Sequence, residues 1–177
     1  MAQEIKLVGV AVAGSIQAAT HMRLLEDMVA IIHRMGWGIA SACQTKGDKH
    51  IVRKMSELGG FTIGFFSNRI GDLEFKGTVT RGVNYYKKDL FEFSREVYGA
   101  CGKNWDFLMP EQQRMFVRYA DIARNVWGSL IWEGDQSSAM FGRFCAIHQR
   151  PVFYFPAKRL DFIQFISDNK TGGTTSV

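Results

Sequence analysis

Three short polar segments contain the residue types that bind phosphate or take part in acid–base chemistry. They are Gly14-Ser15, the segment from Ser41 to Asp48, and the segment from Glu133 to Ser138. Glycine lets a ligand approach the backbone, amides and hydroxyls donate hydrogen bonds to phosphate, and carboxylates accept protons or bind ribose hydroxyls. The candidate nucleotide-binding residues are Gly14, Ser15, Ser41, Cys43, Lys46, Gly47, Asp48, Arg118, Gly134, Ser137 and Ser138.

Each candidate also has an interpretation without chemistry. Glu133 and Asp135 are candidates for a catalytic base, and either one would equally serve as a helix cap. Cys43 becomes a nucleophile only if Lys46 and the following helix terminus lower the pKa of its thiol. Arg118 follows Arg114 by one helical turn, which is the spacing of an anion clamp and also of a solvated basic face.

The established phosphate and metal motifs are absent. Gly9 to Ser15 has the pattern GxxxxGS without the lysine of a P-loop, and no GxGxxG follows the first strand. The four histidines and three cysteines lack metal-ligand spacing and contain no CxxC pair. We therefore predict no metal, no disulfide and no resident cofactor.

The polar segments follow apolar runs that have the character of buried strands. Five such runs alternate with amphipathic helical stretches, and they are Ile5–Ala13, Trp37–Ser41, Phe61–Phe66, Trp127–Trp132 and Pro151–Phe155. This alternation predicts a single α/β Rossmann-like domain over residues 1–169, with a five-stranded, mostly parallel sheet and helices on both faces. Residues 67–109 are predicted to be an insertion between strands three and four, and residues 170–177 a flexible tail. Because parallel strands end at one edge of the sheet, we expect the three polar segments to converge there.

The composition limits the function classes. A chain of 177 residues with 22 Lys and Arg against 17 Asp and Glu has a net charge of +5, which favours anionic partners without indicating a strongly basic patch. No signal peptide and no apolar stretch of membrane-spanning length are evident, so we expect a cytoplasmic protein with no membrane partner. The 14 phenylalanines and the insertion offer apolar surface for a homo-oligomer.

The order and spacing of these motifs resemble the SLOG superfamily, which includes the DNA-processing protein A family and the "lonely guy" phosphoribohydrolases. Gly14-Ser15 is similar to the family's Gly-Ser, Ser41 and Asp48 match the ends of its Ser-Gly-Gly-Ala-x-Gly-Ala-Asp motif, and WEGDQSSAM resembles its Trp-Asp-Gly-x-Ser-x-Gly-Thr variant. Arg118 stands at the spacing of the family arginine that precedes strand four. The chain departs from the phosphoribohydrolases at the catalytic glutamate, where Arg143 stands.

The resemblance implies a protein that binds a nucleotide or nucleotide-derived signalling molecule without turning it over. One alternative is a nucleoside or nucleotide N-glycosidase or glycosyl transferase that uses Glu133 or Asp135. A second alternative is binding of single-stranded nucleic acid. Its candidate aromatic and basic residues are Tyr85, Tyr86, Phe91, Trp105, Lys87, Lys88 and Arg95.

Overall fold

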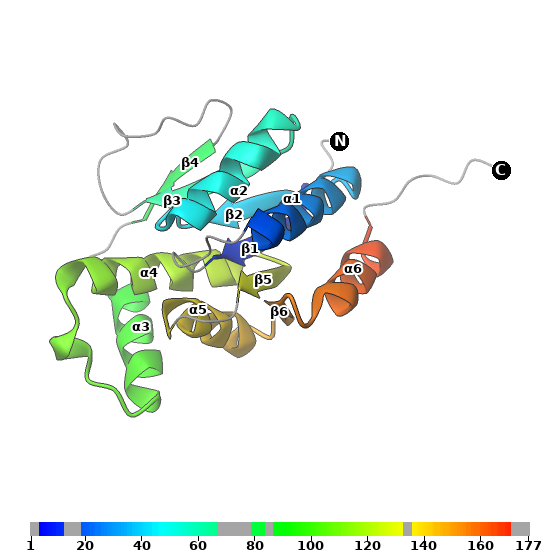
Figure 1. Cartoon of the computed structure of the whole chain (residues 1–177). Coiled ribbons are helices and arrows are strands. Elements are labelled where there is room, and N and C mark those ends of the chain that lie inside the picture. The colour runs from blue at the N-terminus through cyan, green and yellow to red at the C-terminus, as the bar shows by residue number, and fades with distance from the viewer. Residues whose placement is uncertain (1–3, 13–18, 67–78, 84–86, 133–135, 171–177) are drawn as a thin grey trace.

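A computed structural model describes residues 4–12, 19–66, 79–83, 87–132 and 136–170 (Figure 1). The strands are β1 (Leu7–Ala11), β2 (Gly38–Ser41), β3 (Thr62–Phe66), β4 (Val79–Gly82), β5 (Gly128–Trp132) and β6 (Val152–Phe155). The helices are α1 (Ala19–Arg34), α2 (Lys46–Glu57), α3 (Lys88–Ala100), α4 (Pro110–Asn125), α5 (Gln136–Ile147) and α6 (Arg159–Asp168), with a 3-10 turn η2 (Trp105–Phe107). The predicted tail lies outside the described residues except for Lys170.

The strands form one parallel sheet in the order β4-β3-β2-β1-β5-β6. The five predicted strands are all present, so the predicted Rossmann-like fold class is confirmed. A sixth strand, β4, comes from the segment 67–109 and pairs with β3 at the sheet edge. The prediction missed β4 because its sequence, VTRG, has no continuous apolar run.

Helices cover both faces of the sheet, and side-chain alternation along the strands fills two cores. Val8, Val10 and Val12 pack in the core with α1, α2 and α6, whereas Ala11 packs in the core with α3, α4 and α5. Figure 1 shows these two helical layers on opposite faces of the sheet. Gly9 faces the second layer too, and a Cβ atom at this position would lie 2.7 Å from Cζ of Phe141. A glycine in β1 therefore permits the close approach of α5 to the sheet.

Helix α4 is the most enclosed helix of the second layer. It contacts the sheet strands β1 and β3 as well as α3 and α5, and every residue from Met115 to Ala123 is buried. This stretch includes two charged residues, Arg118 and Asp121. Burying a charge away from water costs free energy unless the charge is paired or hydrogen-bonded. The contacts of Arg118 and Asp121 therefore determine how much each buried charge destabilises the fold.

None of the helices in the described part of the chain is long and apolar enough to cross a lipid bilayer. The three cysteines are all free.

Candidate functional site

The sheet order reverses between β1 and β5, which makes the carboxyl ends of these strands the expected ligand-binding position of an open parallel sheet. The loops that follow β1, β2 and β5 leave three adjacent strands, so they begin side by side at this edge. Five predicted residues of these loops lie outside the described residues: Gly14, Ser15, Glu133, Gly134 and Asp135. The geometry of the site is therefore given by the β2–α2 loop, the end of β1, the start of α5 and the side chain of Arg118.

Asp48 joins the end of β1 to the β2–α2 loop. Its Oδ1 accepts a hydrogen bond from the amide of Val12 at 2.9 Å, and its Oδ2 accepts from the amides of Gln44 and Thr45 at 3.1 and 3.2 Å. Thr45, and not Asp48, is the N-cap of α2, because its Oγ1 accepts from the Asp48 amide at 2.9 Å and its hydroxyl donates to the carbonyl of Val12 at 2.7 Å. Asp48 thus acts on the site by fixing two loops against each other.

Sequence reasoning placed Asp48 in the binding set but missed Thr45 and its partner Val12. The available signal was the spacing Thr-x-x-Asp at the start of a helix, which is a capping box. A consequence is that the amides of Gln44 and Thr45 are already occupied by a carboxylate of the protein. The amides at Lys46 and Gly47, in the first turn of α2, have no partner within the helix.

Arg118 reaches this loop from α4 and is 8% exposed. Its Nη1 donates to the carbonyl oxygen of Ala42 at 3.4 Å and its Nη2 donates to Oε1 of Gln44. Its Nε has no hydrogen-bond partner among the described residues, and none of them supplies a carboxylate within ion-pair distance of the guanidinium. Burial lowers the pKa of Arg118, whereas the nearby Tyr119, Cys43 and Asp48 raise it and the charge of Arg114 makes a smaller lowering contribution.

Cys43 does not have the environment of a nucleophile. Burial, followed by the charge of Asp48, raises the pKa of its thiol to about 12, so the thiolate that Lys46 was expected to favour does not form near neutral pH. The residue has a φ of 50° and its amide donates to Oγ of the buried Ser41 at 3.0 Å. His50, the only histidine near it in sequence, instead contacts Glu26 of α1 at 2.9 Å. Ser41 and Cys43 therefore shape the loop.

The remaining described candidates differ in exposure. Lys46 is exposed at the first residue of α2, and Gly47 is buried behind it. Ser137 is half-buried and Ser138 is buried in the first turn of α5. Lys103 reaches this turn and donates to Oε1 of Gln136 at 3.4 Å. These residues present two helix N-termini and at least one lysine ammonium on the carboxyl side of the sheet.

A second charged cluster on α4 was not predicted. Asp121 is buried, and its carboxylate contacts Nε of Arg124 at 2.8 Å and Nε of Arg81 at 3.3 Å. Arg81 also lies over the ring of Phe65 at 5.5 Å. Arg124 follows Asp121 by three residues on α4, but Arg81 belongs to the unpredicted β4, so no local pattern could have identified the whole cluster.

Two of the aromatic residues expected to stack on nucleic-acid bases are described by the structure, the half-buried Phe91 and the buried Trp105. Trp105 is 3% exposed, and its ring packs edge-on against Phe91 at 5.5 Å between centroids. Tyr85 and Tyr86 lie outside the described residues. Arg143, which stands where the phosphoribohydrolases have a catalytic glutamate, is exposed on α5 and lines a groove with α3.

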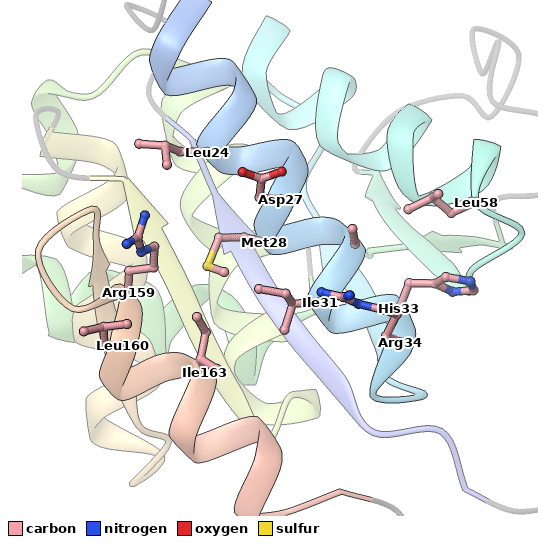
Figure 2. Close-up of a pocket in the computed structure, with 11 residues that line it drawn as sticks. Leu24, Asp27, Met28, Ile31, His33, Arg34, Leu58, Arg159, Leu160 and Ile163 are labelled. Atoms are coloured by element: carbon pink, nitrogen blue, oxygen red, sulfur yellow. The ribbon is translucent and has the colours of Figure 1, made fainter.

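A groove of about 610 Å³ between α1 and α6 lies apart from this edge (Figure 2). Leu24, Ile31 and Ile163 form its apolar wall, and Asp27, Arg34 and Arg159 stand along it. None of the predicted site residues lines it. Among the described residues, no three histidine, cysteine or acidic side chains lie close enough together to hold a metal ion.

Comparison with known proteins identifies the fold. No family model and no curated protein matches the sequence. Similar solved structures include the structural-genomics target TM1055, with a TM-score of 0.56 at 14% identity, covering 87% of this chain and 76% of that one. The molybdenum cofactor carrier protein of Chlamydomonas reinhardtii gives 0.54 at 13% identity, covering 92% and 85%.

DNA processing protein A of Helicobacter pylori, described for its single-stranded DNA binding mode, also gives a TM-score of 0.54 at 13% identity, covering 96% of this chain and 76% of that one. The chain therefore has the fold of the DNA-processing protein A family, one of the families named by the sequence resemblance. At these identities the likeness shows the fold, and the ligand must be argued from the site itself.

Proposed function

We propose that this chain binds a nucleotide or nucleotide-derived signalling molecule through its phosphate, at the carboxyl ends of β1, β2 and β5, without turning it over. Two of the fold neighbours are named for carrying the molybdenum cofactor and for binding single-stranded DNA. This fold therefore serves ligand or nucleic-acid binding in other proteins, and the residues at the edge of this sheet support an anionic ligand here.

The observation that carries the proposal is the buried guanidinium of Arg118. The side chain is 8% exposed, its Nε is unpartnered among the described residues, and its two hydrogen-bond acceptors are neutral groups of the β2–α2 loop. A buried cation without a counterion costs several kcal/mol, and a phosphate at this position would supply the missing negative charge. Arginine also matches phosphate geometry with two parallel hydrogen bonds.

The start of α2 adds a second source of positive potential. The amides of Lys46 and Gly47 carry the positive end of the helix dipole, and the exposed Lys46 side chain adds a full charge. Asp48 fixes this helix start against β1 through its three hydrogen bonds. A phosphate would therefore meet a preorganised set of donors, which reduces the ordering cost of binding.

Binding without turnover is favoured because the described edge lacks an available nucleophile or base. Cys43 holds its proton to a pKa of about 12, and both oxygens of Asp48 are occupied by backbone amides. The alternative of N-glycosidase or glycosyl transferase activity depends on Glu133 or Asp135. Incubation with nucleoside monophosphates tests it: release of free base that is lost in Glu133→Gln or Asp135→Asn would replace our proposal with an enzymatic one.

Single-stranded nucleic acid remains the third hypothesis, supported by the net charge of +5 and by the fold neighbour from Helicobacter pylori. Burial of Trp105 removes one of its expected stacking platforms. Gel shifts at two salt concentrations separate this case, because oligonucleotide binding through several phosphates weakens steeply with salt.

The direct test is a thermal-shift and calorimetric screen with nucleotides, cyclic nucleotides and ADP-ribose-like compounds. A positive compound should bind Arg118→Met about 10- to 100-fold more weakly than wild type, because hydrogen bonds to charged groups contribute about 1.5–3 kcal/mol. Arg34→Met, which removes the same charge from the exposed end of α1, should bind like wild type. Failure of every compound to bind, or equal affinity of Arg118→Met, would overturn the proposal.

A further inference from the structure

Helices α3 and α5 enclose an apolar groove on the outer surface of the second helical layer. Its volume is about 410 Å³. Phe93, Glu96 and Ala100 line it from α3, and Arg143, Ala146 and Ile147 line it from α5. Ile147 is 51% exposed, although it is a large aliphatic residue. An exposed aliphatic side chain beside an apolar groove is typical of a protein–protein contact.

Among the described residues that line this groove, the charged ones are one acid and one base on opposite walls. Glu96 belongs to α3 and Arg143 belongs to α5. Both are exposed, and neither forms an ion pair with another described residue. The groove therefore offers one unpaired charge of each sign, separated by an apolar floor.

From this arrangement we infer that the α3–α5 groove is the contact surface of a homodimer with two-fold symmetry. In an isologous contact the same patch meets itself, so residue i of one copy faces residue j of the other and the reverse. Glu96 of each copy then faces Arg143 of the second copy, which forms two identical ion pairs at the rim. Ile147 of each copy fills the groove of the other, and Ala100 and Ala146 allow the helices to approach closely. The inference concerns assembly and does not depend on the proposed ligand.

The other large groove does not have this self-complementarity. The groove between α1 and α6 carries one acid, Asp27, against two bases, Arg34 and Arg159, together with His33 (Figure 2). A second copy placed there would set four arginines against two aspartates, and this excess of positive charge disfavours association. Its exposed Leu160, at 70% exposure, provides a matched control for Ile147.

Sedimentation velocity over about a hundredfold range of protein concentration tests the inference, since dimerisation follows mass action. Wild type should dimerise. Glu96→Arg and Arg143→Glu should each weaken dimerisation about tenfold or more, because each replaces two attractive pairs with two repulsive ones. Ile147→Asp should abolish the dimer, whereas Leu160→Asp should leave it intact. Circular dichroism and thermal melts check that every variant is folded.

Mixing the two charge reversals gives the decisive result. A heterodimer of Glu96→Arg with Arg143→Glu restores opposite charges at both contacts, so the mixture should dimerise more tightly than either variant alone. The double variant Glu96→Arg/Arg143→Glu should also dimerise with itself. A monomeric wild type, a mixture that stays monomeric, or a dimer that is broken by Leu160→Asp and not by Ile147→Asp would each overturn the inference.

Discussion

Replacement of Arg118 by methionine should weaken ligand binding about 10- to 100-fold while leaving the ligand-free protein as stable as wild type or more stable. Methionine retains most of the aliphatic length of arginine and removes the charge. A residue that served only to hold the fold would give the opposite result, a loss of stability. The variant therefore separates a functional role of the guanidinium from a structural one.

The magnitude follows from the contacts of the side chain. The substitution removes the bond to the Ala42 carbonyl, which at 3.4 Å is at the weak end of the range, and the bond to Gln44, an exposed residue whose Oε1 can be solvated instead. We assign these two bonds about 2 kcal/mol together. Removing a buried cation that forms no ion pair returns part of its desolvation cost, which is several kcal/mol. The free energy of unfolding should thus rise by about 1 to 2 kcal/mol, which corresponds to about 2 to 8 °C in Tm for a chain of this size.

Thermal melts with and without the ligand found in the screen measure both effects. At a ligand concentration of about 100 times Kd, wild type gains about 2.7 kcal/mol, and a 100-fold weaker variant gains about 0.4 kcal/mol. Arg34→Met controls for the change in net charge. A drop in the ligand-free Tm of Arg118→Met by more than about 4 °C would refute the reasoning, because it would show that the guanidinium is a structural support.

Three further predictions follow from the structure. Gly9→Ala should lower the free energy of unfolding by about 1 to 3 kcal/mol in urea titrations, because its Cβ would lie 2.7 Å from the Phe141 ring; an unchanged midpoint would contradict this packing. Asp48→Asn should lower it by about 1 to 3 kcal/mol, since three amide hydrogen bonds lose their charged acceptor, and thermal melts should show it. Stability should fall as pH rises from about 9 toward about 12, because the buried thiols of Cys43 and Cys145 keep their protons in the folded state while unfolded thiols ionise near 9; a Cys43→Ala variant should show a shallower fall in alkaline unfolding titrations.

Local sequence patterns were sufficient to predict the strands in the interior of the sheet. Strands such as LVGVA and GSLIW are buried on both faces and read as continuous apolar runs. Strand β4 lacks this signal because it lies at the sheet edge, where Val79 is 49% exposed and Arg81 pairs with Asp121 of α4. The contact between Arg81 and Asp121 joins residues that are 40 positions apart, and a local hydrophobic pattern cannot reveal such a contact.

The candidate site, too, could be predicted from the sequence only in part. The spacing of Arg118 from the following strand selected it from the sequence, but its burial and its contact with Gln44 depend on the packing of α4 against the β2–α2 loop. Cys43 was considered a conditional nucleophile, and only its three-dimensional burial decides the direction of its pKa. The polar segments after β1 and β5 remain predictions, because the residues that would bind lie outside the described part of the chain.

The two buried charges of α4 provide an internal comparison that supports a functional role for Arg118. Asp121 lies one turn further along the same helix, and two arginines neutralise its carboxylate at 2.8 and 3.3 Å. The protein thus compensates one buried charge of α4 with ion pairs, as stability requires. Arg118 is also buried, at 8% exposed against 3% for Asp121, yet only neutral acceptors form hydrogen bonds with it among the described residues. A buried guanidinium that forms no ion pair with a described residue and keeps an unpartnered Nε is expected at a functional site, where stability is given up for binding.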